Sequence, residues 1–392
     1  MQKRLIFSAI LGFVGFVTSF GAHVVAVNLP VYAQQVGVGL AIIGLLIAAY
    51  DFAEIIAKPI FGAIGDRQGM KKTMLLGIAL FTIASGLYLF INPNLLLLVR
   101  FLQGIGAAAL SAVSLALVGE YYKQNRGKAY GIYNAIKGSG YVISPAIGGA
   151  IVLQSNFSSI FIATAIIGGI AFVLSLFLPD PRKKMSLADD DDEFSLSAFV
   201  AVFKEPKLAP WYLVTIVNMF FVGILFGFLP VRVYALGYDP LTTGILLSLV
   251  ALSYLLIQPV AGALADRTNI VTTIRAGLII SALGIIFIAF ATGPILALLS
   301  VVSGIGVGIV WTNTDALVSG LAQKGKMGAT MGAAGSFKEF GDMVGPLLIG
   351  FLSQAFGLAS GFVICGILGL LSVLIISRPA PKHTSKAQVV LK

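Results

Sequence analysis

Charged side chains occur within several apolar stretches of this sequence, and each stretch is long enough to cross a bilayer. A charge near the centre of a bilayer costs about 2.5–3.5 kcal/mol even on insertion scales, so such a residue should be buried with a partner or functional. Carboxylates in that setting can carry protons, whereas an arginine stays protonated and can only hold an anion. The positions are Asp51, Glu54, Arg100, Lys137, Asp315, Lys338, Glu339 and Asp342.

The spacing of these charges predicts which of them act together. Asp51 and Glu54 are one helical turn apart and share a face. Lys58 follows Glu54 by four residues, so these two are expected to form an ion pair, and Lys338 and Asp342 have the same spacing. Asp51 and Arg100 have no partner on their own helices, so a functional role is favoured for both. His23, alone in its stretch, is more typical of a buried, hydrogen-bonded histidine.

The composition identifies the class of protein. The chain has 392 residues, of which 58% are hydrophobic and only 11% are charged, with a mean hydropathy of +0.98. Soluble domains carry about 25% charged residues, so the surplus apolar surface must face lipid. An enzyme is not indicated, because no metal-ligand spacing or nucleophile constellation occurs, and the loop-like run 320–326 lacks the Ser or Thr of a phosphate-binding loop. The single cysteine, Cys365, supports neither a disulfide nor a metal site.

Apolar runs of roughly 20 residues predict an all-α membrane protein with twelve transmembrane helices. Glycines interrupt the fourth, fifth, tenth and eleventh of these runs. The predicted spans are 5–27, 41–61, 73–91, 95–121, 128–153, 158–178, 209–231, 241–264, 272–291, 295–320, 327–353 and 358–377.

The basic residues predict the orientation of these spans. With a cytoplasmic N-terminus, 21 of the 26 basic residues fall on the cytoplasmic side, four lie within spans and only Arg232 lies outside. We therefore expect a multi-pass protein of the plasma or inner membrane with both termini in the cytoplasm. The +10 net charge is a topology signal and does not indicate nucleic-acid binding. The expected organisation is a six-helix bundle over 1–178, a cytoplasmic linker over 179–208, a second bundle over 209–377 and a tail over 378–392.

The two halves repeat each other at an offset of roughly 200 residues. Leu29-Pro30-Val31 recurs at 229–231, the run 62–67 recurs at 262–267, and Gly104-Ile-Gly106 recurs at 304–306. Carriers built from such repeats bind their substrate near the membrane midplane, between the repeats. The repeat therefore predicts two pseudo-symmetric bundles that rock about a central site, with access from each side in turn.

Three motifs in the sequence resemble signatures of the major facilitator superfamily. The loop after the second span contains Gly62, Asp66, Arg67, Gly69, Lys71 and Lys72 in the spacing of that family's motif A. The fourth span begins Arg100-Phe-Leu-Gln103-Gly104, which is similar to motif B. The fifth span resembles motif C of the drug–proton antiporter branch with twelve spans, through Gly140, Pro145, Gly148 and Gly149, and the eleventh echoes it with Gly345 and Pro346. The resemblance extends along the whole chain.

The motifs have physical interpretations of their own. Glycines at 62 and 69 allow a tight turn and a close helix approach. Asp66 stands at a helix boundary, where a carboxylate can meet the positive end of a helix from the other half and latch the cytoplasmic side. Arg67, Lys71 and Lys72 can pair with Glu120 or simply mark the cytoplasmic side. Pro145 and its glycines predict a bend that seals the pathway or, equally, ordinary close packing.

Together these features predict a proton-coupled exporter of small amphipathic or drug-like compounds. Asp51 or Glu54 would carry the proton, and Arg100 would displace that proton or hold the carboxylate, since the second and fourth spans share a half. The expected partners are the substrate, protons and lipid. No cofactor is expected, because the proton gradient supplies the energy, and the protein should work as a monomer.

The same residues are compatible with two other functions. Arg100, Lys137 and Lys338 could instead bind an anionic metabolite. A receptor or scaffold that does not transport is a further alternative, although the buried charges argue against it, and a channel fits the repeat less well than a carrier.

The orientation can be tested by protease access. We expect the acidic segment Asp189 to Glu193 to be cleaved in inverted vesicles and protected in intact cells, because the linker that carries it is predicted to be cytoplasmic. Cleavage from outside intact cells would contradict the predicted topology.

Overall fold

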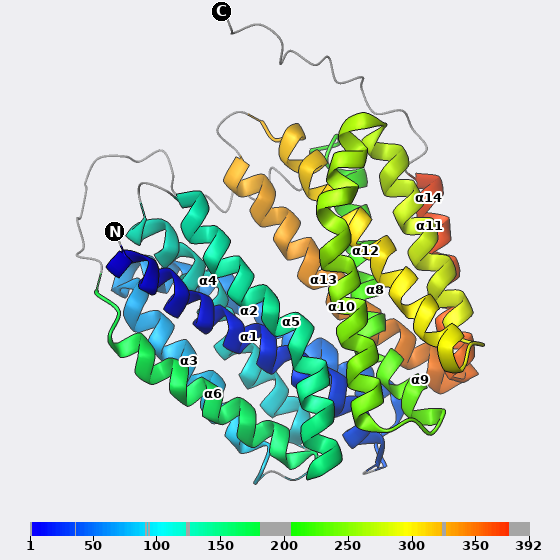
Figure 1. Ribbon diagram of the computed structural model, residues 1–392, viewed down its shortest axis with the longest axis horizontal. Helices are drawn as coiled ribbons and strands as arrows, with labels where there is room; N and C mark the ends of the chain where they lie inside the picture. The colour runs from blue at the N-terminus through cyan, green and yellow to red at the C-terminus, as the bar shows by residue number, and fades with distance from the viewer. Residues whose placement is uncertain are drawn as a thin grey trace, which may run out of the picture.

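The fold consists of two bundles of long helices, shown in Figure 1. This computed structural model describes residues 2–35, 37–90, 92, 95–122, 126–180, 205–323 and 327–375, and these ranges contain no strand. The acidic run of the predicted linker and the tail over 378–392 lie outside the described residues. The first bundle contains α1 (Gln2–Gln35), α2 (Leu40–Gln68), α3 (Met70–Leu87), α4 (Leu96–Tyr121), α5 (Arg126–Gln154) and α6 (Ser158–Leu176).

The second bundle repeats this order with one interruption. Its first span is divided into two helices at Phe228, so that α8 and α9 together correspond to α1. Its helices are α8 (Ala209–Gly227), α9 (Leu229–Ala235), α10 (Pro240–Arg267), α11 (Ile270–Ile288), α12 (Gly293–Leu321), α13 (Met327–Phe356) and α14 (Leu358–Ile375).

The predicted end of the first helix at residue 27 is wrong, because α1 continues to Gln35 with Pro30 inside it. The equivalent Pro230 instead stands in the first turn of α9, where a missing amide hydrogen costs nothing. Hydropathy measures the part of a helix that lies in hydrocarbon and does not register its extension into the interface. The two halves therefore use the same proline differently.

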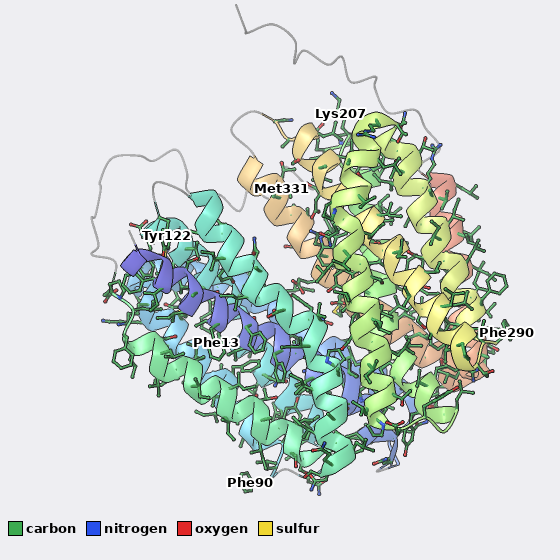
Figure 2. The ribbon with its side chains drawn as sticks, viewed as in Figure 1. Phe13, Phe90, Tyr122, Lys207, Phe290 and Met331 are labelled. Atoms are coloured by element: carbon green, nitrogen blue, oxygen red, sulfur yellow. The ribbon has the colours of Figure 1, made fainter. Side chains whose placement is uncertain are left out.

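Most helices have the length and composition of membrane spans. Among the described residues, ten helical segments are long and apolar enough to cross a membrane, and 358–374 is a shorter apolar helix. The remaining long helix, α13, differs in carrying three charged residues close together, Lys338, Glu339 and Asp342. Large apolar side chains face outward, as Figure 2 shows for Phe90 and Phe290. These two side chains are 83% and 68% exposed. This outer surface suits contact with lipid chains.

Close packing within each bundle follows the repeat. A Cβ at Gly104 would overlap the carbonyl of Tyr50, and a Cβ at Gly304 would approach the carbonyl of Val250, at an offset of 200 in both helices. Gly106 packs against Phe81, and its equivalent Gly306 packs against Ser281, again at an offset of 200 in both helices. Glycine lets the backbones of membrane helices approach this closely. The sequence repeat is thus a repeat of helix contacts.

The same glycine–carbonyl contact joins the two bundles, at the end of the molecule where α1 finishes and α2 begins. We call this the far end, and the side where α1 begins the terminal end. Here α2 packs on α13, since Gly44 lies against the carbonyl of Pro346, and α10 packs on α5, since Gly244 lies against the carbonyl of Pro145. A second pair of contacts, Gly149 with the Pro240 carbonyl and Gly350 with the Leu40 carbonyl, completes a pseudo-symmetric seam.

Polar contacts reinforce the seam. The amide of Leu40 donates to Gln354 Oε1 at 3.0 Å, and the Gln35 amide group donates to the Tyr234 hydroxyl at 2.7 Å. Figure 1 shows the two bundles touching at this end and diverging towards the terminal end. The far end of the molecule is therefore closed, and the terminal end is splayed.

The helix that begins at the seam has a well-formed start. The carboxylate of Asp239 caps α10 by accepting a hydrogen bond from the Thr242 amide at 2.9 Å and another from the Thr242 hydroxyl. These hydrogen bonds, the one from the hydroxyl first, lower the pKa of Asp239. The cap fixes the first turn of α10, whose Pro240 carbonyl meets Gly149.

The seam predicts the effect of enlarging one glycine. Gly149→Val should wedge α5 from α10 and open the far end, because any Cβ at this position overlaps the Pro240 carbonyl. We expect faster labelling of a cysteine placed at Ala26, in a Cys365→Ala background, by an impermeant maleimide applied from the far side. Gly131→Val on the same helix is the matched control, because nothing lies within 4 Å of a Cβ there. Equal labelling of the two variants would contradict the seam.

Candidate functional site

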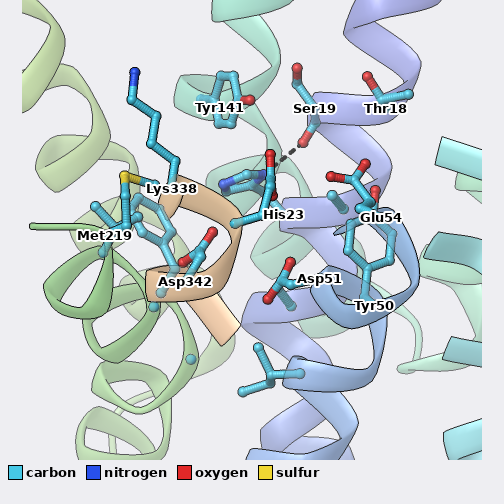
Figure 3. Close-up of a pocket in the computed structure, with 18 of the residues that line it drawn as sticks. Thr18, Ser19, His23, Tyr50, Asp51, Glu54, Tyr141, Met219, Lys338 and Asp342 are labelled. Atoms are coloured by element: carbon cyan, nitrogen blue, oxygen red, sulfur yellow. Dashed lines mark hydrogen bonds between the residues drawn. The ribbon is translucent and has the colours of Figure 1, made fainter. Parts of the chain in front are cut away.

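A cavity of about 280 Å³ lies between the two bundles, at the apex of the splay. Figure 3 shows side chains from both halves directed into it. Of the eight charged positions singled out in the sequence, only Asp315 is absent from its lining, and Lys58 is an additional member. The charged lining residues are Asp51, Glu54, Lys58, Arg100, Lys137, Lys338, Glu339 and Asp342.

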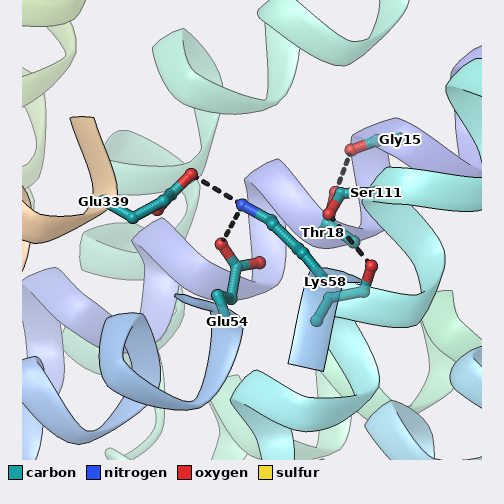
Figure 4. Close-up of polar contacts among 7 residues, drawn as sticks. Gly15, Thr18, Glu54, Lys58, Ser111 and Glu339 are labelled. Carbon is teal, nitrogen blue, oxygen red and sulfur yellow. Dashed lines mark hydrogen bonds and ion pairs between the residues drawn. The ribbon is translucent and has the colours of Figure 1, made fainter. Parts of the chain in front are cut away.

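Lys58 connects the two halves within this cavity (Figure 4). Its ammonium lies 2.7 Å from Glu54 Oε2, one turn away on α2, and 2.6 Å from Glu339 Oε1 on α13. The predicted pair between Glu54 and Lys58 is confirmed. The second carboxylate, from the opposite bundle, could not be predicted from spacing along one helix.

Lys338 has a different partner from the one that its spacing predicts. Its ammonium lies 2.6 Å from Asp315 Oδ2 on α12 and 5.1 Å from the centre of the Trp311 ring. The expected pair with Asp342 is therefore wrong. The side chain extends away from Asp342 in Figure 3, because the neighbouring helix offers both a carboxylate and an aromatic face.

Arg100 is buried, with 2% of its surface exposed, and its contacts are with uncharged groups. It donates to Gln103 Oε1 at 2.8 Å, and its guanidinium lies 4.3 Å from the centre of the Tyr50 ring. The expected contact with the carboxylate of Asp51 or Glu54 is not made in this conformation. Gln103 and Tyr50 take its place, and neither carries a charge that would have marked it in the sequence.

The cavity also has an aromatic wall that the sequence analysis missed. Tyr254 and Trp311 stack with their centres 5.9 Å apart and their planes 8° from parallel. His23 presents its ring edge-on to Tyr141 at 4.4 Å and to Phe226 at 5.3 Å, which come from opposite halves. His23 Nδ1 also lies 3.0 Å from the Ser19 carbonyl, as expected for a hydrogen-bonded histidine. Aromatic residues are common on lipid-facing surfaces, so only geometry separates these from the rest.

The motif A residues lie at the terminal end, away from the seam. Gly69 has a φ of +108° and lets α2 turn directly into α3, which confirms the predicted tight turn. The predicted close approach at Gly62 is wrong for this conformation, since nothing lies within 4 Å of a Cβ there. The side chain of Asp66 lies outside the described part of the structure, and the latch stays a prediction.

The basic residues of motif A include one with a clear contact. Lys71 donates to the carbonyls of Leu176 and Leu178, at the end of α6, where the helix dipole favours a cation. This contact replaces the expected pair with Glu120, which is exposed at the end of α4. Arg67 and Lys72 lie nearby on α2 and α3.

The motif C glycines serve two interfaces. Gly140 lies against Ser19 and Gly148 against Asn28, so both bring α5 close to α1 within the first bundle. Gly149 belongs to the seam, and α5 continues through Pro145 without a break. On α13, Gly345 lies against the Phe220 carbonyl of α8, and Pro346 belongs to the seam.

Comparison with known proteins identifies relatives of this chain. The sequence profile of the Major Facilitator Superfamily matches residues 11–239 and 211–391. The chain is 32% identical over 185 residues to the riboflavin transporter RibZ of Clostridioides difficile (strain 630), which covers 46% of this chain and 40% of RibZ. It is 29% identical over 186 residues to the quinolone resistance protein NorA of Staphylococcus aureus, which covers 47% of each chain. Each alignment spans less than half of the relative.

Solved structures share the fold over nearly the whole chain. The nucleoside transporter NupG superposes with a TM-score of 0.79 at 14% identity, covering 95% of this chain and 98% of NupG. A bacterial homologue of the human lysosomal transporter Spinster, in an inward-facing and occupied conformation, gives a TM-score of 0.79 at 16% identity and covers 94% and 95% of the two chains. These matches confirm the predicted fold of twelve transmembrane helices. The chain belongs to the Major Facilitator Superfamily.

Proposed function

We propose that this protein is a secondary active transporter that exports small amphipathic or drug-like compounds in exchange for protons. The charged cavity between two pseudo-symmetric bundles, closed at the far end by the seam, is the main support for this function. Alternating access requires such a site, together with contacts that can close one side at a time. The names of two relatives, a riboflavin transporter and a quinolone resistance protein, support a small-molecule substrate.

The conformation fits the loading step of an exporter. In the topology predicted from the basic residues, the splayed terminal end faces the cytoplasm. A substrate would then enter from the cytoplasm, and closure of that end with opening of the seam would release it outside. The proposed carrier works as a monomer in the plasma membrane, without a cofactor.

Asp51 is the best candidate for the proton carrier. It is 8% exposed, lines the cavity and has no ion pair within the described residues, whereas Glu54 is held by Lys58. A carboxylate that alternates between a closed and a hydrated environment can bind and release a proton as the cavity changes exposure. Arg100 would act as a fixed positive charge, since it cannot release its own proton.

The anion-carrier alternative has partial support. Arg100 and Lys137 line the cavity without a carboxylate partner in the described ranges, but Lys338 is already paired with Asp315. Flux of a lipophilic cation compared with that of an organic anion, in the same vesicles, separates the two functions.

The coupling role of Asp51 gives a direct test. Asp51→Asn should abolish uphill transport driven by a pH gradient in proteoliposomes, and it should also abolish substrate-induced proton release in detergent. Asp239→Asn is the matched control, since asparagine also caps helices and residue 239 lies at the end of the molecule. Normal proton release from Asp51→Asn would move the coupling site elsewhere in the cavity.

A further inference from the structure

The facing helices α2 and α13 run antiparallel, and their contacts fix the register between them. From the far end inward, Leu40 meets Gly350, Gly44 meets Pro346, and Lys58 meets Glu339. Residue numbers rise along one helix as they fall along the other. This register places the middle of α2 opposite the charged turn of α13.

Each of these helices carries two carboxylates spaced by three residues. Asp51 and Glu54 share one face of α2, and Glu339 and Asp342 share one face of α13. Because the helices are antiparallel, Glu54 lies opposite Glu339 and Asp51 lies opposite Asp342. The two sets of facing carboxylates are about 4.5 Å apart along the helix axes. We call these the Glu54–Glu339 rung and the Asp51–Asp342 rung. Figure 3 shows Asp51 and Asp342 on facing helices beside the same space.

The Glu54–Glu339 rung is occupied by the side chain of Lys58. The ammonium of Lys58 lies 2.7 Å from one carboxylate and 2.6 Å from the other. Two carboxylates from opposite halves of the protein thus bind a primary ammonium at this depth in the cavity. The ammonium group of a substrate could form the same contacts with another pair of facing carboxylates.

The second rung has no such cation. Within the described residues, no ion pair is formed by Asp51 or Asp342, although both line the cavity from facing helices. Lys58 is held by the first rung, and Arg100 is turned to Gln103 and Tyr50. Gly223 of α8 leaves room for the carboxylate of Asp342, since a Cβ at this position would lie 3.0 Å from Asp342 Oδ1. Two adjacent carboxylates repel each other unless a proton or a cation is shared between them.

We infer that the Asp51–Asp342 rung binds the cationic group of the transported molecule, an organic ammonium whose apolar body lies against the aromatic wall of Phe226, Tyr254 and Trp311. Calling this ligand a transported molecule rests on the proposed function, but the binding itself does not. Because one carboxylate comes from each half, the bound ammonium ties α2 to α13 as Lys58 does at the first rung. A proton and the ammonium compete for the same carboxylates.

The test compares two probes with the same ring system, one that carries a positive charge and one that is neutral. Naphthylmethylamine is an ammonium at neutral pH, and naphthylmethanol is its neutral counterpart. Their affinities for the purified full chain are measured by titration calorimetry in detergent, without a gradient. We expect the amine to bind at least about tenfold more tightly, the scale of a charge-assisted contact. Asp342→Asn and Asp51→Asn should each reduce its affinity to that of the alcohol, whereas Asp239→Asn should leave both affinities unchanged.

Each outcome bears on one claim. Equal binding of amine and alcohol to the wild type, or an unchanged preference in Asp342→Asn, would overturn the inference. Thermal unfolding of each variant in the same detergent shows whether a loss of binding reflects misfolding, and unchanged alcohol binding shows that the cavity is intact. A clear preference for the amine combined with no transport driven by a pH gradient would contradict the proposed function and leave the cation site standing.

Discussion

The closed far end depends on glycines that approach backbone carbonyls across the seam between the two bundles. Glycine lets the backbones of α2 and α13, and of α10 and α5, approach so closely that a Cβ would overlap the facing carbonyl. A close approach of this kind favours Cα–H···O=C contacts. Each such contact contributes only about 0.5–1 kcal/mol, so the seam closes the far end without locking it. Because both sides of the seam come from the internal repeat, each contact has a pseudo-symmetric copy.

The same helices that close the seam also carry the charges. Gly44 and Asp51 lie two turns apart on α2, and Pro346 and Asp342 lie one turn apart on α13. A change of charge in the cavity therefore acts on the helices whose contact closes the far end. The ion pairs of Lys58 with Glu54 and Glu339 lie on the terminal side of that contact and link the halves where they begin to diverge.

The sequence predicted what depends on one helix or on the repeat. The spans, the pairing of Glu54 with Lys58 and the gathering of buried charges between the halves follow from hydropathy, from spacing and from the cost of charge in lipid. The partners of Lys338 and Arg100 did not follow, because Asp315, Gln103 and Tyr50 are brought to them by packing between or along helices. The aromatic wall and the different use of Pro30 and Pro230 have no signal in spacing, since each depends on the local path of the neighbouring helix.

If the two bundles rock about the charged cavity, the distance between them at one end must shorten as the distance at the other end lengthens. Spin labels at Glu120 and Gly320 report on the terminal end, and labels at Ser155 and Phe356 report on the far end, with all four positions exposed and each pair related by the repeat. Double electron–electron resonance on the detergent-solubilised protein, with and without a transported compound, should show the first distance shortening as the second lengthens. Distances that stay fixed, or that change in the same direction, would contradict a rocking motion of the two bundles.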